Sequence, residues 1–493
     1  GRATFRNSLG ECRRSADRTE TAVLCFRQAV ALDPAYAEPW VNLAKLSVAA
    51  GRPGDGDRQA RRAVHLSPLL PDAWRTLGHA ALERGEAVLA ERAGRRGLAL
   101  LPTDGEALGH AARLAGQRGD RDLAERLLGR VLRLAPEAAH AWRERADLTL
   151  KGGAHAKALP MLQRALALAP DFPEALNNLG GALLGLRCRE DAGRHYRRAI
   201  QLRPGYPDPW NNAGSALQER GDTALALDHY RRAVALSPAH PVAYANMGET
   251  IRSSAAGLPD FRVAETLCRR ALALVPGHGA ALNALSVLCL DLRRLEEAEA
   301  GFRTLVEQDP ESAQARFNLS LVLLTGGRLR EGWEHYEERW RIGEIPVPKA
   351  PGRLWTGEPL EGRSILLHAE QGHGDTLQFV RYAPLVAERG GRVHLAVHSG
   401  LRRLMERIPG LEGVHDLYGG LPATEFHCPL LSLPRAFGTE LHSVPAAVPY
   451  LSADRAEVER WRMRLPADGR LKVGLVWSGD PRPHCPEANA VDR

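Results

Sequence analysis

The sequence predicts an α-solenoid of repeated helix pairs followed by a smaller α/β domain. Three observations predict this fold class. The 493 residues are too many for one ordinary core. Prolines recur at a fixed spacing through residues 1–343. After a proline-rich linker at 344–361, short apolar runs alternate with helical patterns over residues 362–452.

The repeated unit is 34 residues long. Apart from a four-residue insertion near 255–259, the spacing holds for Pro34, Pro68, Pro102, Pro136, Pro170, Pro204, Pro238, Pro276 and Pro310. Proline ends a helix because it lacks an N–H and disfavours helix in the residue before it. Each unit then holds two amphipathic helices, which must stack on neighbouring units to bury their apolar faces. Nine units end at the last of these prolines, and a tenth is expected to reach about residue 343.

Four further positions repeat together with the prolines. Six residues after each proline stands a large side chain: Trp40, Trp74, Leu108, Trp142, Leu176, Trp210, Tyr244 and Leu282. Ten residues after it stands, in most units, a small one: Ala44, Gly78, Ala112, Ala146, Gly180, Gly214, Gly248 and Ser286. The position 22 residues after is usually alanine, and the position 26 residues after is often aromatic: Tyr196, Tyr230 and Phe302. This pattern resembles the tetratricopeptide repeat, and the resemblance implies a superhelix with a concave groove.

A row of asparagines stands eight residues after the prolines. Its members are Asn42, Asn178, Asn212, Asn246 and Asn318, and other units carry Thr76, His110, Glu144 and Ala284 there. An asparagine amide both donates and accepts, so a regular row could grip the backbone of an extended peptide. The row resembles the asparagine ladder of O-linked N-acetylglucosamine transferases. The alternative is that these amides only bond neighbouring helices. We expect the groove to bind a protein or peptide segment.

The last third predicts a parallel sheet. The segment 331–340 is expected to be an aromatic helix that caps the last repeat. Beyond the linker, strands are predicted at 365–368, 393–397, 414–417 and 425–428, with helices at 376–388, 401–407 and 430–437 between and after them. Alternation of strand and helix is typical of a parallel, doubly wound sheet. In such sheets ligands bind at the carboxyl ends of the strands.

The loop after the first of these strands is the candidate active site. It reads HAEQGHGDTLQF from His368 to Phe379. An acidic side chain at a helix start is often a cap, but Asp375 could also be a general base. Glu370 and His373 could share or orient that role. Amides at a helix start attract negative charge. We therefore expect Gln371, Gly372 and Gly374 to contact substrate.

The same third resembles bacterial tetratricopeptide proteins with a glycosyltransferase-like domain. The matching segments are LLHAEQGHGDTLQFVRYAPL, HCPLLSLPRAFGT, VPYL and KVGLVWSGDP. The Gly374–Asp375 turn is also similar to the start of heptosyltransferases, in which an Asp is the proposed base. The resemblance implies a Rossmann-like domain at 362–452, the acceptor-side half of a GT-B fold. It also implies a nucleotide-sugar donor and a protein or glycan acceptor, with no cofactor.

Residues 453–493 are expected to supply a connecting helix at 455–464 and the first strand, 471–477, of a truncated second α/β domain. The chain is expected to lack parts at both ends, and the fragment to be inactive because nearly all of the donor site is missing. A non-enzymatic repeat scaffold for assembly or secretion is the alternative function.

Composition narrows the classes of function and location that remain. The net charge is +7, but arginines are spread among acidic residues without a long basic run, which argues against nucleic-acid binding. Seven scattered cysteines without a C-x-x-C pair predict a reducing, cytoplasmic location and no disulfide framework. No metal-ligand spacing stands out. Apolar runs are short, so no membrane insertion is expected.

Overall fold

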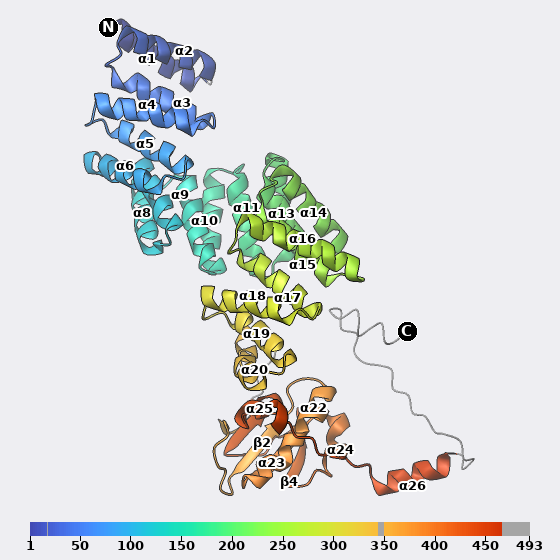
Figure 1. The fold of residues 1–493 in the computed structure, drawn as a ribbon. Coiled ribbons are helices and arrows are strands. Elements are labelled where there is room, and N and C mark those ends of the chain that lie inside the picture. Colours follow the sequence, from blue (N-terminus) through green and yellow to red (C-terminus); the bar gives the residue numbers. More distant parts are fainter. Residues whose placement is uncertain (17, 344–349, 466–493) are drawn as a thin grey trace. The chain divides into compact units, whose positions relative to one another are not determined.

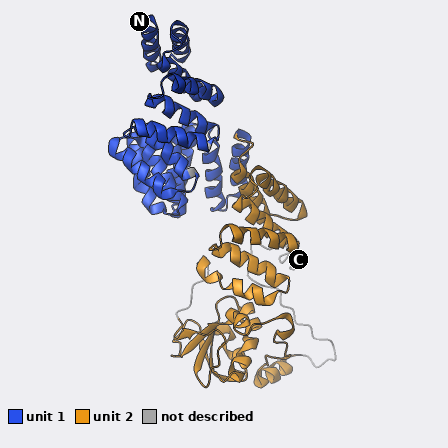
Figure 2. Cartoon of the chain, turned by 60° about the vertical axis from the view of Figure 1, so that its left-hand side comes forward, with its two compact units in different colours: residues 1–236 blue, residues 237–493 orange. Residues whose placement is uncertain are grey.

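A computed structural model describes residues 1–16, 18–343 and 350–465. The chain divides into two compact units, residues 1–236 and 237–493 (Figure 2). The first unit is helical throughout its described part, and the second holds further helix pairs and a parallel sheet (Figure 1). The predicted strand at 471–477 lies outside the described residues.

The first unit contains helices that pack in consecutive pairs. Their bounds are α1 (Arg2–Ser15), α2 (Thr19–Leu32), α3 (Ala37–Ala49), α4 (Pro53–Leu66), α5 (Pro71–Glu83), α6 (Ala87–Leu100), α7 (Gly105–Gln117), α8 (Arg121–Leu134), α9 (Ala139–Lys151), α10 (His155–Leu168), α11 (Pro173–Gly185), α12 (Arg189–Leu202), α13 (Pro207–Gln218) and α14 (Thr223–Leu236). These pairs confirm the helical repeat predicted from the 34-residue period.

A left-handed residue turns the chain between the two helices of a unit. It stands 17 residues after the proline of each repeat. In residues 1–236 it is glycine at Gly51, Gly85, Gly119, Gly153 and Gly221, with φ between 71° and 85°. Glycine suits this position because it has no Cβ to clash in the left-handed region. Arg187, at the same position between α11 and α12, takes this conformation without being glycine, with φ of 63°.

In several helix pairs an aromatic ring of one helix packs against a glycine of the other. Tyr196 and Tyr230 are 1% and 0% exposed. A Cβ added to Gly180 would come within 2.5 Å of the Tyr196 ring, and one added to Gly214 within 2.6 Å of Tyr230. The small residue ten positions after the proline is therefore small because an aromatic ring 16 residues later occupies the space in front of it.

The second unit begins with more helix pairs and continues into the sheet domain. Its helices are α15 (Pro241–Ser253), α16 (Leu258–Leu274), α17 (Gly279–Asp291), α18 (Leu295–Gln308), α19 (Ala313–Thr325), α20 (Leu329–Tyr336), α21 (Arg339–Ile342), α22 (His373–Phe379), α23 (Ala383–Glu388), α24 (Arg402–Met405), α25 (Leu433–Ala436) and α26 (Arg455–Arg464). Its strands are β1 (Arg353–Leu354), β2 (Ser364–His368), β3 (Arg392–Val397), β4 (Leu411–Asp416) and β5 (Phe426–Pro429).

The five strands form one parallel sheet in the order β1-β5-β2-β3-β4. The parallel sheet predicted from the alternating pattern is confirmed. β2 is central and all five of its residues are buried, as expected for a strand covered on both faces. The structure adds β1, which lies in the segment expected to be a linker, and Trp355 next to it is 1% exposed in the sheet domain's core.

The aromatic helix at the end of the repeats does more than cap them. Trp333 and Tyr336 of α20 pack against the core of the sheet domain, and the Trp333 ring meets Phe379 of α22 edge-on at 5.6 Å. Phe317 of α19 joins them from the last repeat. One apolar core thus continues from the last helix pair into the sheet. None of the described helices is long and apolar enough to cross a membrane.

Candidate functional site

The candidate loop lies at the carboxyl end of the central strand. β2 ends at His368, and α22 begins at His373. The strand order reverses at this point. The chain continues from β2 to β3 on one side of β2, whereas β5 pairs with β2 on the other side. Such a switch point is where α/β sheets bind ligands. The sequence therefore placed the candidate loop at the position that the topology favours.

Asp375 sits in the first turn of α22, where it is partly exposed. Its Oδ2 atom accepts a hydrogen bond from the Gly372 backbone N–H at 3.1 Å. This contact is the capping geometry that the sequence left open as an alternative. Proton transfer by Asp375 stays a prediction. A carboxylate that is partly exposed at the strand end can cap the helix and still face an acceptor hydroxyl.

Glu370 is held inside the protein by an arginine. Its side chain is 0% exposed, and both carboxylate oxygens accept from Nη2 of Arg339, at 3.0 and 3.1 Å. Burial raises the pKa of Glu370 to about 7, while the charge and hydrogen bonds of Arg339 oppose that rise. A catalytic role for Glu370 stays a prediction, but its carboxylate is already engaged in an ion pair out of solvent.

Arg339 comes from α21, the helix after the last repeat, and occupies the switch point itself. Its guanidinium is 1% exposed and also bonds Ser432 Oγ at 2.8 Å and Glu337 at 2.8 Å. Ser432 follows β5 and in turn donates to Glu337 at 2.9 Å. The loops after β2 and β5 are therefore joined through one buried arginine. Sequence reasoning missed it, although it lies near the end of the segment 331–340 that was predicted as an aromatic helix.

The other predicted loop residues are spread around this network. Gln371 donates through Nε2 to the Tyr336 hydroxyl at 3.0 Å, so it also contacts the last repeat. His373 is exposed and stacks on His398, which follows β3, with ring centroids 4.7 Å apart. Burial, together with the neighbouring His373, lowers the pKa of His398. His398 is thus a second strand-end histidine that the sequence analysis did not single out.

The two loop glycines do not use the conformations reserved for glycine. Gly372 has φ of −67° and Gly374 lies within α22, so neither is left-handed. A Cβ on Gly374 would meet no heavy atom within 4 Å among the described residues. Both glycines are exposed. The backbone at these two positions does not require glycine, and contact of Gly372 and Gly374 with substrate stays a prediction.

The asparagine row is largely paired between helices. Asn212 donates to Asn177 Oδ1 at 2.9 Å, Asn318 to Asn283 Oδ1 at 2.9 Å and Asn42 to Asn7 Oδ1 at 3.1 Å. Each partner stands one position earlier in the preceding unit. This is the alternative that the sequence left open, interhelical bonding. Asn178 and Asn246 are partly exposed, and peptide contact by the row stays a prediction.

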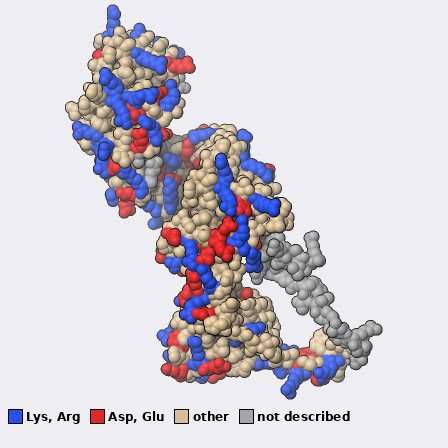
Figure 3. Space-filling view, in the orientation of Figure 1, with Lys and Arg blue, Asp and Glu red and all other residues tan. Residues whose placement is uncertain are grey.

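Charges on the surface agree with the sequence. Figure 3 shows basic and acidic side chains interspersed on the visible face of the described residues. Many arginines have acidic neighbours in the next repeat, such as Arg189 with Glu219 at 2.8 Å. Among the described residues no group of three or more metal-binding side chains comes together. The described cysteines are free thiols.

Comparison with known proteins supports the repeats. Residues 111–171, 155–207 and 178–241 match one tetratricopeptide repeat model, and residues 256–329 match another. Protein FlbA of Caulobacter vibrioides (strain ATCC 19089 / CIP 103742 / CB 15) is 30% identical over 231 residues. That match covers 42% of this chain and 39% of the relative, so the chain spans well under two thirds of it. Taken with the 34-residue helix pairs, these matches show that residues 111–241 and 256–329 contain tetratricopeptide repeats.

Proposed function

We propose that this chain binds a protein segment through its tetratricopeptide repeats. Stacked helix pairs offer long, rigid surfaces, and repeats of this kind support protein–protein interaction. The observation that carries the proposal is the match of residues 111–241 and 256–329 to tetratricopeptide models, together with the paired helices there. The interspersed surface charge favours a protein partner over a nucleic acid.

Binding is tested with a random peptide library selected against the whole chain. Selected peptides are expected to bind with a measurable Kd, and to bind more weakly when Asn178, Asn212 and Asn246 are changed to Ala together. Arg197→Ala, on the exposed face of α12, is the control and should leave the Kd unchanged. If no selected peptide binds the whole chain, the proposal fails. If peptides bind equally well to the triple variant, the asparagine row is not the contact surface.

A second function is proposed for the sheet domain, as the acceptor-side half of a GT-B-type glycosyltransferase. The observation that favours it is the position of Asp375: partly exposed, in the first turn of a helix, at the carboxyl end of the central parallel strand. The repeats would present the acceptor hydroxyl, and Asp375 would take its proton while the hydroxyl oxygen displaces the nucleotide from the sugar. A second α/β domain in the full-length protein would bind the nucleotide-sugar.

The transferase proposal is tested on the full-length protein by following release of nucleotide from nucleotide-sugars. Asp375→Asn keeps an oxygen that can accept the Gly372 N–H, so it should remove activity without unfolding α22. Glu412→Gln, on the exposed side of β4, is the matched carboxylate control. Equal donor consumption by wild type and Asp375→Asn would exclude Asp375 as the base.

A further inference from the structure

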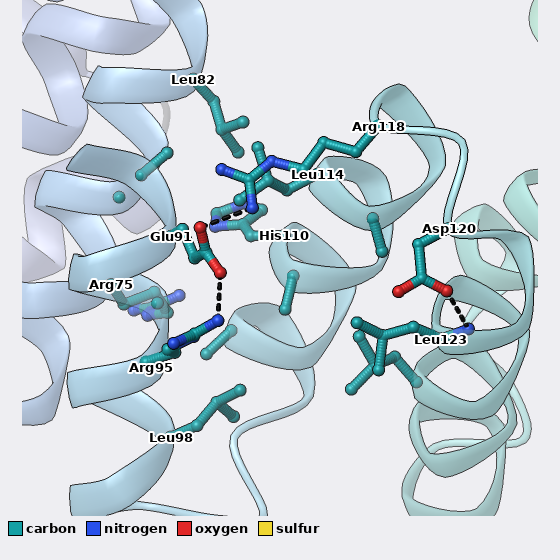
Figure 4. A pocket seen from close by; sticks show the side chains of 17 residues that line it. Arg75, Leu82, Glu91, Arg95, Leu98, His110, Leu114, Arg118, Asp120 and Leu123 are labelled. Carbon is teal, nitrogen blue, oxygen red and sulfur yellow. Dashed lines mark hydrogen bonds and ion pairs between the residues drawn. The ribbon is translucent and has the colours of Figure 1, made fainter. Parts of the chain in front are cut away.

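Two neighbouring helix pairs of the unit formed by residues 1–236 enclose a pocket. The pocket has a volume of about 470 Å³ and is lined from α5, α6, α7 and α8 (Figure 4). Its lining is mostly leucine and alanine, with Glu91, His110, Arg118 and Asp120 among the polar members. A volume of several hundred Å³ with a few polar groups is typical of a ligand site.

The pocket lies where an aromatic side chain stands in some other repeats. The position 26 residues after the proline is Tyr196 or Tyr230 in later units, but Gly94 in the unit of α5 and α6. The glycine that faces the ring is retained there as Gly78. A Cβ added to Gly78 would have its nearest heavy atom, the Ala90 backbone oxygen, at 3.5 Å, whereas one added to the equivalent Gly180 would come within 2.5 Å of the Tyr196 ring. This helix pair therefore keeps the glycine that faces the ring in other pairs but lacks the ring itself.

A buried polar atom lies in the same pocket. His110 stands at the asparagine-row position of α7, and its Nδ1 atom is buried without a hydrogen-bond partner among the described residues. Its ring lies 4.6 Å from that of His79. A buried polar atom without a partner costs stability, so a ligand that bonds it gains affinity. A phenol hydroxyl suits either tautomer of this histidine, because it can both donate and accept.

The charged groups around the pocket are paired. Arg75 forms ion pairs with Asp72, Asp104 and Glu106. Glu91 accepts hydrogen bonds from both Arg95 and Arg118 (Figure 4). These charges therefore give no preference for acidic or basic residues on either side of a bound ring.

We propose that this pocket takes a tyrosine side chain from the protein segment that the repeats bind. The inference rests on the proposed protein-binding function and names the anchor of that partner. The ring fills the space in front of Gly78, as Tyr196 and Tyr230 fill it in front of their own glycines, and the hydroxyl bonds His110 Nδ1. Flanking residues of the segment occupy the rest of the pocket.

The test uses the whole chain and three blocked tripeptides, with binding followed by saturation-transfer NMR. Ac-Gly-Tyr-Gly-NH2 is expected to bind at least tenfold more tightly than Ac-Gly-Leu-Gly-NH2 or Ac-Gly-Phe-Gly-NH2. Gly94→Tyr restores the residue of the sibling units, so it should fold, raise the Tm and abolish tripeptide binding. Gly193→Tyr places the same residue on α12, where an added Cβ also has open space, and should leave binding unchanged.

Other outcomes overturn the inference in distinguishable ways. If the tyrosine tripeptide binds Gly94→Tyr as well as wild type, the ring is held elsewhere, and protein binding by the repeats survives while this pocket does not. If p-cresol binds wild type and is lost in Gly94→Tyr, but no tripeptide binds, the pocket is a small-molecule site and the proposal is wrong. If neither binds, the pocket is an empty packing defect.

Discussion

Replacing Arg339 with methionine should loosen the sheet domain, and more so at high pH. The guanidinium is 1% exposed and is the cation that faces Glu370, whose side chain is 0% exposed. Methionine keeps most of the volume but leaves Glu370 and Glu337 without their shared partner. Removing one member of a buried ion pair typically costs about 3–5 kcal/mol. We expect a loss of that size in the opening free energy of β2 and β5 at pH 8.

The pH dependence follows from the direction of the Glu370 shift. Burial raises its pKa from 4.5 to about 7 in the folded protein. Between these values the native state holds a proton that the unfolded chain releases, so the stability contributed by this group falls as the pH rises from about 4.5 to about 7. Without Arg339 the pKa of Glu370 rises further. The penalty of Arg339→Met should therefore be small at pH 5 and large at pH 8.

Hydrogen exchange measured by mass spectrometry can follow this effect strand by strand. Peptides covering β2 and β5 should exchange faster in Arg339→Met at pH 8, after correction for the intrinsic exchange rate, and adding Glu370→Gln should recover most of the loss. Arg341→Met is the matched control, because Arg341 lies two residues away with its side chain 51% exposed. If the two arginine variants exchange alike at both pH values, the buried pair does not hold the strands together.

Three further outcomes are expected. Arg187→Gly should raise stability by about 0.5–1 kcal/mol in urea unfolding, because the left-handed turn costs arginine more than glycine; an unchanged midpoint would contradict this. Asn212→Ala should cost about 1–3 kcal/mol by the same assay, since it leaves the buried Asn177 amide oxygen without its donor; a loss near zero would show that water replaces the bond. Asp375→Ala should speed exchange in residues 369–379 by removing the bond to Gly372, whereas Asp375→Asn should not; equal exchange in both would show that the cap adds no stability.

Much of the fold could be predicted because its signals are local. Proline spacing, helix amphipathicity and strand alternation all act within one element or between neighbours along the chain, so the repeats and the parallel sheet emerged from pattern alone. Boundaries moved by a few residues, and β1 was missed because a two-residue edge strand, Arg353–Leu354, carries no periodicity.

What the sequence by itself determined about this protein is a stack of 34-residue helix pairs, a parallel sheet after it, and a loop with Asp375 at a strand end. Only the tertiary structure decided how side chains far apart in sequence are used. Arg339 forms an ion pair with Glu370, 31 positions later, and Asn212 donates a hydrogen bond to Asn177, 35 positions earlier. No described heavy atom lies within 4 Å of a Cβ added to Gly94. The physical reason is that hydrogen bonds and cavities depend on distances of a few tenths of an ångström between separate elements, and a pattern along the chain does not contain them.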